Sequence, residues 1–309
     1  MASLAFLFPG QGSQYEGMGQ DLFTNSSHAR ERYAEAHSIL GWSVIDLSTP
    51  ESGEKINTTC YTQPALYTLS CIISEHLLAN GIQPAIVAGH SAGEYAALTT
   101  AGAWDFATGL RVIAERARLM HEKAAPGAMA AVLGLEEDAL QTACSEWTEG
   151  SVSIANYNSP RQIVISGDEN AVHGIMPLLK ERGARRVLPL PVSGAFHSPL
   201  MKDAQQLFDE FLSTITINPP RIPWVSNNTA TIITEAETVR QHLVRQFCEP
   251  VRWVQSLKLI EQKCDTALEV GAGKVLQGLV KQCTENLPCE ITSTFEQTEK
   301  VIQDYGKQT

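Results

Sequence analysis

The chain has 309 residues, of which 43% are hydrophobic and 18% are charged, and its formal net charge at pH 7 is −11. This composition is typical of a soluble globular protein. The negative charge argues against a general nucleic-acid binder, which needs a basic surface. Since no stretch reaches the roughly 20 uncharged apolar residues of a membrane-spanning helix, we expect neither nucleic acid nor membrane as a partner.

Seven cysteines are scattered along the chain, and none forms a Cys-x-x-Cys pair. Their odd number and irregular spacing argue against a disulfide framework and against a zinc site. We therefore expect no bound metal and a reducing, cytoplasmic location. The apolar start of the chain has no basic segment before it, and we interpret it as a buried strand rather than a signal peptide.

Strands and helices alternate in the first part of the chain. Apolar runs predict the strands, and apolar positions at helical spacing predict the helices. The predicted elements are a strand over 2–8, a helix over 63–79, a strand over 85–88, a helix from about 92 and a helix over 105–123. This alternation favours an α/β fold with a largely parallel sheet.

A different order of elements follows. We predict a strand over 128–135, a helix over 136–147, strands over 152–157 and 162–166, a helix over 170–182 and a strand over 186–190. The order βαββαβ is that of a ferredoxin-like unit. Prolines lie at both crossings, which suits a small domain of residues 126–192 inserted into a large domain of residues 1–125 and 193–309.

The large domain is predicted to resume with a helix over 199–212. Strands over 223–226 and 266–270 follow, and a Gly-Ala-Gly turn comes directly after the second of them. The tail beyond residue 297 is polar, and we expect it to be frayed or peripheral.

Residues 89–93 have the sequence Gly-His-Ser-Ala-Gly and fit the pattern Gly-x-Ser-x-Gly. The motif lies between a predicted strand and a predicted helix, which is the setting of a nucleophile elbow. Ser91 is therefore the candidate nucleophile, and the backbone N–H of Ala92 is a candidate donor to an oxyanion. A turn without any chemistry is the alternative that five residues alone leave open.

His197 is the candidate general base among eight histidines. Ser198 and Pro199 are typical of a helix start, so His197 falls at the crossing between the two domains, on the rim of any cleft between them. An exposed loop histidine is the alternative. His90 is the second candidate, but it adjoins Ser91 on a tight turn, where neighbouring side chains point apart, and we interpret it as a structural contact.

Three arginines, Arg111, Arg116 and Arg118, lie on the predicted helix after the serine motif. The planar guanidinium of an arginine suits bidentate binding of a carboxylate. The alternative is a solvated helix face, which we prefer for Arg111 and Arg118, although spacing alone does not select Arg116.

Seven blocks in order over roughly residues 4–280 resemble the malonyl-CoA:acyl carrier protein transacylases, a family that includes the acyltransferase domains of polyketide and fatty acid synthases. The blocks are 8–14, 89–94, Arg116 with Met120, 156–160, 192–201, Gln246 with 250–253, and 269–276. Two departures from the family pattern are Ala272 in place of a common proline and Tyr157 in place of a common phenylalanine. Neither falls on a residue with a chemical role.

The resemblance implies roles for individual residues. Ser91 matches the nucleophile, His197 the general base, and Arg116 the arginine that pairs with the free carboxylate of the malonyl group. The backbone N–H groups of Gln11 and Ala92 match the oxyanion hole.

Two further roles follow from the same resemblance. Gln246 matches a residue whose backbone carbonyl orients the histidine, so no acidic third member is expected. Phe196 is expected to crowd a 2-methyl branch, because related domains that accept methylmalonyl usually carry a smaller residue there.

The implied activity is transfer of malonyl from malonyl-CoA to the phosphopantetheine thiol of an acyl carrier protein, through an ester on Ser91. The implied fold is an α/β-hydrolase-like large domain with the ferredoxin-like insert. We expect no cofactor, and we expect a monomer. The alternatives are a trans-acting polyketide acyltransferase, a serine thioesterase or hydrolase, and a non-catalytic interaction protein of the same fold.

Docking of an acidic carrier protein onto a chain with a net charge of −11 requires a local basic patch. Two segments are candidates. The first is the densest and the one we expect to dock the carrier, and it holds Lys180, Arg182, Arg185 and Arg186, whereas the second, which holds Lys274 and Lys281, is the alternative. A solvated face without a docking role is the further alternative for both.

Overall fold

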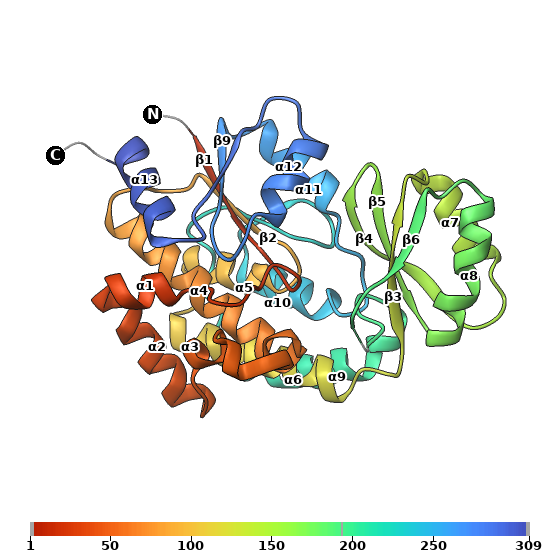
Figure 1. Ribbon diagram of the computed structural model, residues 1–309, viewed down its shortest axis with the longest axis horizontal. Helices are drawn as coiled ribbons and strands as arrows, with labels where there is room; N and C mark the ends of the chain where they lie inside the picture. Colours follow the sequence, from red (N-terminus) through yellow and green to blue (C-terminus); the bar gives the residue numbers. More distant parts are fainter. Residues whose placement is uncertain (1–2, 193, 307–309) are drawn as a thin grey trace.

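The computed structural model describes residues 3–192 and 194–306, which form one larger and one smaller β-sheet with their covering helices (Figure 1). Residue 2, included in the first predicted strand, and residue 193, at a predicted domain boundary, lie outside the described residues. Within these ranges, no helix combines the length and the apolar character needed to cross a membrane.

The larger sheet has six strands in the order β10-β9-β1-β2-β7-β8. Its strands are β1 (Leu4–Phe8), β2 (Ile86–Gly89), β7 (Trp224–Val225), β8 (Ile232–Ile233), β9 (Thr266–Glu269) and β10 (Cys289–Ile291). Every neighbouring pair is parallel except the pair of β7 with the edge strand β8. The predicted parallel sheet is confirmed, with one antiparallel strand at its edge.

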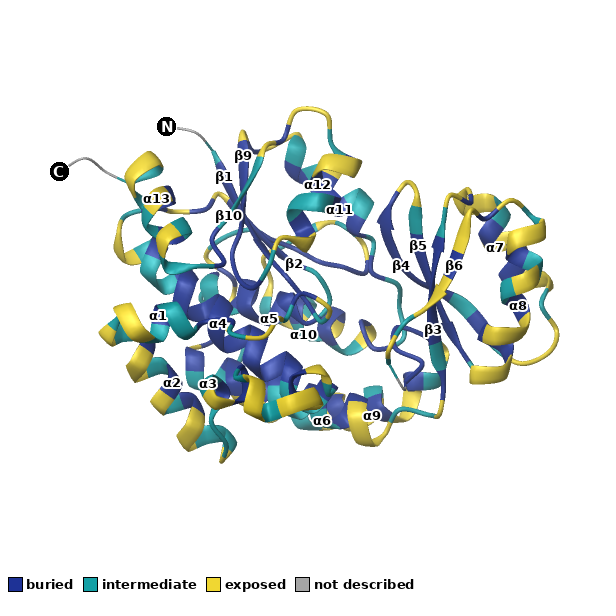
Figure 2. Ribbon diagram, viewed as in Figure 1, coloured by how far each residue is buried: buried dark blue, intermediate teal, exposed yellow. Residues whose placement is uncertain are grey.

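Helices cover both faces of this sheet (Figure 1). They are α1 (Gln20–Asn25), α2 (Ser27–Leu40), α3 (Val44–Leu47), η1 (Pro50–Asn57), α4 (Thr59–Ala79), α5 (Gly93–Thr100), α6 (Phe106–Glu122), η2 (Pro199–Met201), α9 (Lys202–Leu212), α10 (Ala236–Arg245), α11 (Trp253–Glu261), α12 (Val275–Cys283) and α13 (Phe295–Tyr305). Strand β1 alternates between the two cores. Phe6 and Phe8 pack in one core with α4 and α6, whereas Ala5 and Leu7 pack in another with α11 and α12. Figure 2 shows α4 buried along most of its length.

The smaller sheet has four antiparallel strands in the order β4-β5-β3-β6. They are β3 (Ala128–Leu133), β4 (Val152–Ser159), β5 (Gln162–Gly167) and β6 (Arg186–Pro189), and the two helices are α7 (Glu137–Glu146) and α8 (Glu169–Glu181). The predicted ferredoxin-like order βαββαβ is confirmed. Both helices cover the face turned away from the larger sheet (Figure 1).

The other face of the smaller sheet looks toward the larger one. Met129 and Val164 pack in the main core, while their neighbours Ala130 and Ile165 pack under α7 and α8. The chain crosses between the two parts at a bridge between Pro126 and Gly194. We retain 126–192 as the proposed bounds of a small domain.

The tail beyond residue 297 is predicted to be frayed or peripheral, but residues up to 305 are not frayed. Helix α13 runs to Tyr305 and begins with a capping box between Thr294 and Gln297. Its buried residue Val301 packs against the main core, and the backbone N–H of Phe295 donates to Asp21 (2.6 Å). Two reciprocal capping bonds and one buried apolar side chain hold this otherwise polar segment in place.

Candidate active site

Ser91 lies on the sharp connection between β2 and α5, with a positive φ of 49°. A serine in this left-handed region is strained, and such strain persists only where the surroundings enforce it. A Cβ at Gly89 would lie 2.0 Å from the backbone of Gly93, and one at Gly93 would lie 2.0 Å from the carbonyl of Phe8. The two glycines of the motif are therefore required by close backbone contact.

Ser91 and His197 form a hydrogen-bonded pair, although 106 positions separate them in the chain. The distance from Ser91 Oγ to His197 Nε2 is 2.8 Å, and His197 Nδ1 lies 2.8 Å from the backbone carbonyl of Gln246. Because a carbonyl only accepts, Nδ1 carries the proton and Nε2 is left to accept from the serine hydroxyl. This is the geometry of a nucleophile with its base.

The environment of His197 keeps its ring neutral. The side chain is buried, so the alternative of an exposed loop histidine is wrong. Burial first, and the nearby charge of Arg116 second, lower the pKa of His197 to about 3. A neutral imidazole can accept a proton, whereas an imidazolium cannot.

His90 points away from Ser91 toward the smaller sheet. Its Nε2 lies 2.8 Å from Asn158 Oδ1, and its ring packs edge-on against Trp253 at 5.3 Å. These contacts support the interpretation of His90 as a structural residue rather than as the base.

Burial distinguishes Arg116 from the other two arginines of α6. Arg116 is fully buried, whereas Arg111 is exposed and Arg118 pairs with Glu115 and Glu122. Its Nη2 donates to Ser91 Oγ (3.1 Å). A guanidinium so close to the nucleophile can bind a carboxylate carried by the acyl group.

Three acceptors surround the Arg116 guanidinium. Nη1 donates to Gln63 Oε1 (2.6 Å) and Nη2 donates to Gln246 Oε1 (2.8 Å), besides the bond to Ser91. Within residues 3–192 and 194–306, the buried Nε has no hydrogen-bond partner. The group is thus held in place by neutral oxygens and retains an unused donor.

The turn after β1 packs against the elbow. A Cβ at Gly10 would lie 2.3 Å from the carbonyl of His90 and 3.6 Å from the backbone nitrogen of Ala92. Gln11 and Ser91 line the same cavity. The two predicted oxyanion donors, the N–H groups of Gln11 and Ala92, therefore belong to segments in direct contact.

A cavity of about 140 Å³ opens above Ser91 between the two sheets. Residues from both parts of the chain line it, among them Gln63, Met120, Phe196 and His197 from the larger part and Asn156 from the smaller. Phe196 is predicted to limit the size of the acyl group. A Cβ added at Gly194 would lie 2.4 Å from the Phe196 ring, so the ring packs directly against Gly194. The ring is therefore held in place at the cavity wall.

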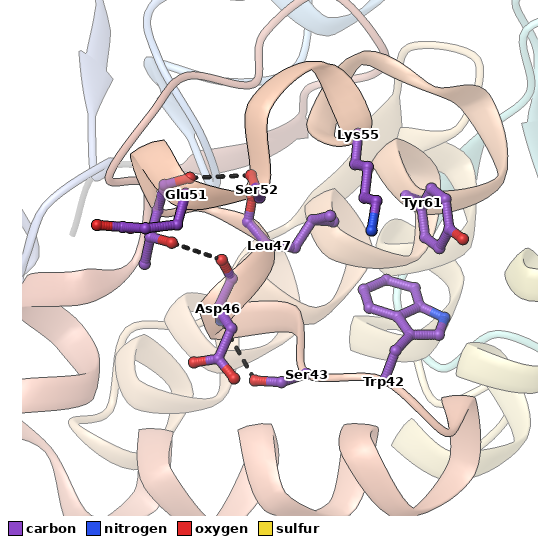
Figure 3. Close-up of a pocket in the computed structure, with 9 residues that line it drawn as sticks. Trp42, Ser43, Asp46, Leu47, Glu51, Ser52, Lys55 and Tyr61 are labelled. Carbon is purple, nitrogen blue, oxygen red and sulfur yellow. Dashed lines mark hydrogen bonds between the residues drawn. The ribbon is translucent and has the colours of Figure 1, made fainter.

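Another cavity, of about 330 Å³, lies beside α3 and η1, and Figure 3 shows Lys55, Trp42 and Tyr61 in its lining. No histidine or cysteine is among the residues that line it. It lacks a nucleophile–base pair and is not the candidate active site.

Three residues that sequence reasoning did not single out also belong to the site: Gln63, Glu94 and Asn227. Asn227 Oδ1 accepts from the backbone N–H of Ser91 (2.8 Å), and its Nδ2 donates to the carbonyl of Gly89 (2.7 Å). Asn227 directly follows a predicted strand, and carboxyl ends of parallel strands meet at one edge of the sheet. That signal could have found Asn227, whereas nothing local marks Gln63.

Within the part of the chain that the structure describes, no group of three or more His, Cys, Asp or Glu residues is placed to hold a metal ion.

A strained serine on a strand-to-helix turn, bonded to a buried neutral histidine, defines an enzyme of the serine-nucleophile class that forms covalent acyl intermediates. The family model described as acyl transferase domain matches residues 5–304. A malonyl CoA-acyl carrier protein transacylase of Bacillus subtilis (strain 168) is 41% identical over 308 residues, covering 98% of this chain and 97% of its own. The chain therefore belongs to the acyl transferase family, in its group of malonyl CoA-acyl carrier protein transacylases.

Solved structures show the same likeness. The crystal structure of an acyl carrier protein S-malonyltransferase from Vibrio cholerae is 37% identical, with a TM-score of 0.93 over 97% of this chain and 100% of the other. A malonyl-transacylase in complex with a type II polyketide synthase acyl carrier protein is also 37% identical, with a TM-score of 0.94 over 98% of this chain and 100% of the other. The fold prediction is confirmed over nearly the whole chain.

Proposed function

We propose that this protein transfers a malonyl group from malonyl-CoA to the phosphopantetheine thiol of an acyl carrier protein, through an ester on Ser91. The observation that carries the proposal is the buried Arg116, whose Nη2 lies 3.1 Å from Ser91 Oγ. Such a cation suits an acyl group that ends in a carboxylate. The names of the relatives support the same activity.

In the first step, Ser91 Oγ attacks the thioester carbonyl carbon while His197 Nε2 takes the hydroxyl proton. The N–H groups of Gln11 and Ala92 stabilise the oxyanion, each by about 3 kcal/mol. Collapse of the intermediate breaks the carbon–sulfur bond, and His197 returns the proton to the coenzyme A thiolate.

In the second step, the carrier thiol attacks the malonyl ester. His197 takes the thiol proton and returns it to Ser91 Oγ as the ester bond breaks. The Gln246 carbonyl orients the histidine in both steps, so no acidic third member is required. Serine, histidine and arginine supply the whole reaction, and we propose that it uses no cofactor and no metal.

A direct test mixes the protein with malonyl-CoA and either the holo or the apo form of an acyl carrier protein. The holo form should gain the mass of one malonyl group, and the apo form, which lacks the thiol, should gain none. If neither form of the carrier gains a malonyl group, the proposal is wrong.

The pathway is a finer question than the reaction. One matched structure is a malonyl-transacylase in complex with the acyl carrier protein of a type II polyketide synthase. A monomer is our proposal because Ser91, His197, Arg116 and Gln246 all come from one chain. The cytoplasmic location stays a prediction, consistent with cysteines that are all free in the described residues.

The pH profile of acylation should be flat where an ordinary histidine would titrate. Burial lowers the pKa of His197 to about 3, so the base stays neutral as the pH falls from 7 to 5. For a histidine with a pKa of about 6.5, the fraction of neutral imidazole would fall roughly 25-fold over that range. Rapid-quench measurement of malonyl-enzyme formation should show no such fall, and a decline with an apparent pKa near 6.5 would contradict the assignment.

Phe196 should disfavour a 2-methyl branch on the acyl group. The packed ring leaves little room beside His197, and one methyl group is worth about 1–3 kcal/mol. Wild type should therefore use methylmalonyl-CoA roughly 10-fold less well than malonyl-CoA in kcat/KM, and Phe196→Ser should narrow the difference. Equal use of both substrates by wild type would exclude this role.

We propose that the carrier docks beside α12 rather than at α8. A cavity of about 410 Å³ joins His90 and Asn158, next to the elbow, to Val275 and Gln282 of α12. Lys274 and Lys281 flank that stretch and are exposed. This continuity with the active site supports the second basic segment.

The first basic segment is less suitable. Helix α8, with Lys180, lies on the side of the smaller sheet that faces away from the larger one (Figure 1). Arg182 is already paired with Glu146. A carrier bound at α8 would lie on the opposite side of the smaller sheet from Ser91, which follows β2 (Figure 1).

Charge reversal tests this choice. Lys274→Glu with Lys281→Glu should raise KM for the carrier about tenfold at low salt, because two attractive charges become repulsive. The kcat/KM for malonyl-CoA should change less. Lys180→Glu is the control and should leave KM for the carrier near the wild-type value. A larger rise of this KM in Lys180→Glu than in the double variant would place the docking site at α8.

A further inference from the structure

We infer that Glu94, in the first turn of α5, is a positioning residue that turns the side chain of Gln246 so that its oxygen, rather than its nitrogen, faces Arg116. The inference rests on the proposed malonyl transfer, because it concerns how the arginine is prepared for a carboxylate. Glu94 lies three positions after Ser91 and is fully buried.

Both carboxylate oxygens of Glu94 face N–H donors. Oε1 accepts from the backbone N–H of Asn227 (2.7 Å), and Oε2 accepts from the side-chain Nε2 of Gln246. Within the described residues, neither oxygen has a Lys, Arg or His nitrogen at ion-pair distance. The carboxylate is therefore used as a pure acceptor inside the core.

This contact sets the direction of the Gln246 amide. Its Nε2 points at Glu94 and at the carbonyl of Ser91 (3.2 Å), so its Oε1 points at Arg116 Nη2 (2.8 Å). An acceptor at this position holds the guanidinium, whereas an NH₂ group would oppose it. One amide thus links a buried carboxylate to a buried guanidinium without a direct ion pair.

The same carboxylate also supports the nucleophile turn. Asn227, whose backbone N–H it accepts, holds the Ser91 N–H with Oδ1 and the Gly89 carbonyl with Nδ2. Glu94 therefore contacts both Asn227, which holds the Ser91 N–H, and Gln246, which accepts from Arg116.

Glu94 is a buried carboxyl group whose two oxygens both face N–H donors. Burial raises the pKa of Glu94 to about 8, although the Asn227 N–H and the charge of Arg116 oppose that rise. The N–H donors that face both oxygens favour the ionised form, and the inference rests on this geometry. A buried carboxylate without an ion pair is costly, and such groups are retained where geometry matters. Arg116 Nη2 stays beside Ser91 Oγ at 3.1 Å, where the acyl group would be carried.

The test is Glu94→Gln, which keeps the size of the side chain and removes one acceptor. The Asn227 donor is a backbone N–H that cannot turn, so the new carbonyl stays with it and the new NH₂ faces Gln246. The Gln246 amide must then turn and present its own NH₂ to Arg116. We expect the malonyl-to-acetyl ratio of kcat/KM for acyl-enzyme formation to fall about tenfold or more, because charge-assisted bonds to arginine are the stronger ones.

The matched control is Glu269→Gln. Glu269 is equally buried and accepts from two backbone N–H groups, those of Leu276 and Gln277, at the start of α12. It should lower the melting temperature and leave the malonyl-to-acetyl ratio unchanged. An unchanged ratio in folded Glu94→Gln overturns the inference, whereas absence of malonyl-enzyme in wild type would overturn the proposed function instead.

A double variant that exchanges the two residues provides a second test if Glu94→Gln fails to fold. Glu94→Gln combined with Gln246→Glu restores an N–H donor facing an acceptor, but places a carboxylate directly against Arg116. We expect this protein to fold and to lose its preference for malonyl, because the arginine is already neutralised. A wild-type malonyl preference in the exchanged protein would overturn the inference.

Discussion

Ser91→Ala is expected to abolish covalent labelling by malonyl-CoA and to lower transfer to the carrier by at least about 10³-fold. Ser91 lines the cavity, and its hydroxyl contacts the neutral base at 2.8 Å. Without its nucleophile the enzyme cannot form the acyl-enzyme, so the whole covalent reaction path is lost. Intact-mass spectrometry should show one added malonyl group on wild type and none on the variant.

The chain supplies a matched control in Ser226. This serine is also buried and also contacts a histidine, with Oγ 2.7 Å from Nδ1 of His242, but it lies outside the cavity lining. Ser226→Ala should therefore still take one malonyl group. Full labelling of Ser91→Ala would show that another residue carries the acyl group.

Arg116→Ala should change which acyl group the protein prefers. A carboxylate that loses its buried partner loses about 2 kcal/mol or more, which corresponds to a factor of about 30. The malonyl-to-acetyl ratio of kcat/KM should fall by at least that factor, because the acetyl group carries no carboxylate that Arg116 could bind.

Arg118→Ala on the same helix is the control for this variant. Arg118 pairs with Glu115 and Glu122 at the surface, so its removal should leave the ratio unchanged. An unchanged ratio in Arg116→Ala, or an equal change in both variants, would exclude Arg116 as the carboxylate partner.

Local patterns predicted the elements that position the site. Strands β1 and β2 are short apolar runs ended by Pro9 and by the glycine motif, and the βαββαβ unit is marked by turns and changes of periodicity. The helices over residues 20–57 were missed because few of their positions are buried, as in α2, where only Ala29, Tyr33 and Ala36 are. A weak apolar face gives a weak periodic signal.

The site itself was predictable only in part. The serine motif is local, so Ser91 could be chosen from its neighbours alone. The choice of Arg116 among three arginines depends on burial, which spacing along α6 does not reveal. The Glu94–Gln246 contact joins residues 152 positions apart, and no pattern within one segment indicates it.

In the proposed reaction, the acyl group passes to a carrier thiol rather than to water. Isolated malonyl-enzyme should be divided between buffer, apo carrier and holo carrier, and the masses of enzyme and carrier followed with time. We predict that the ester persists in buffer and with apo carrier, and that holo carrier removes the malonyl group and gains its full mass. Release of free malonate at the same rate in all three samples would exclude transfer to the carrier and identify a hydrolase.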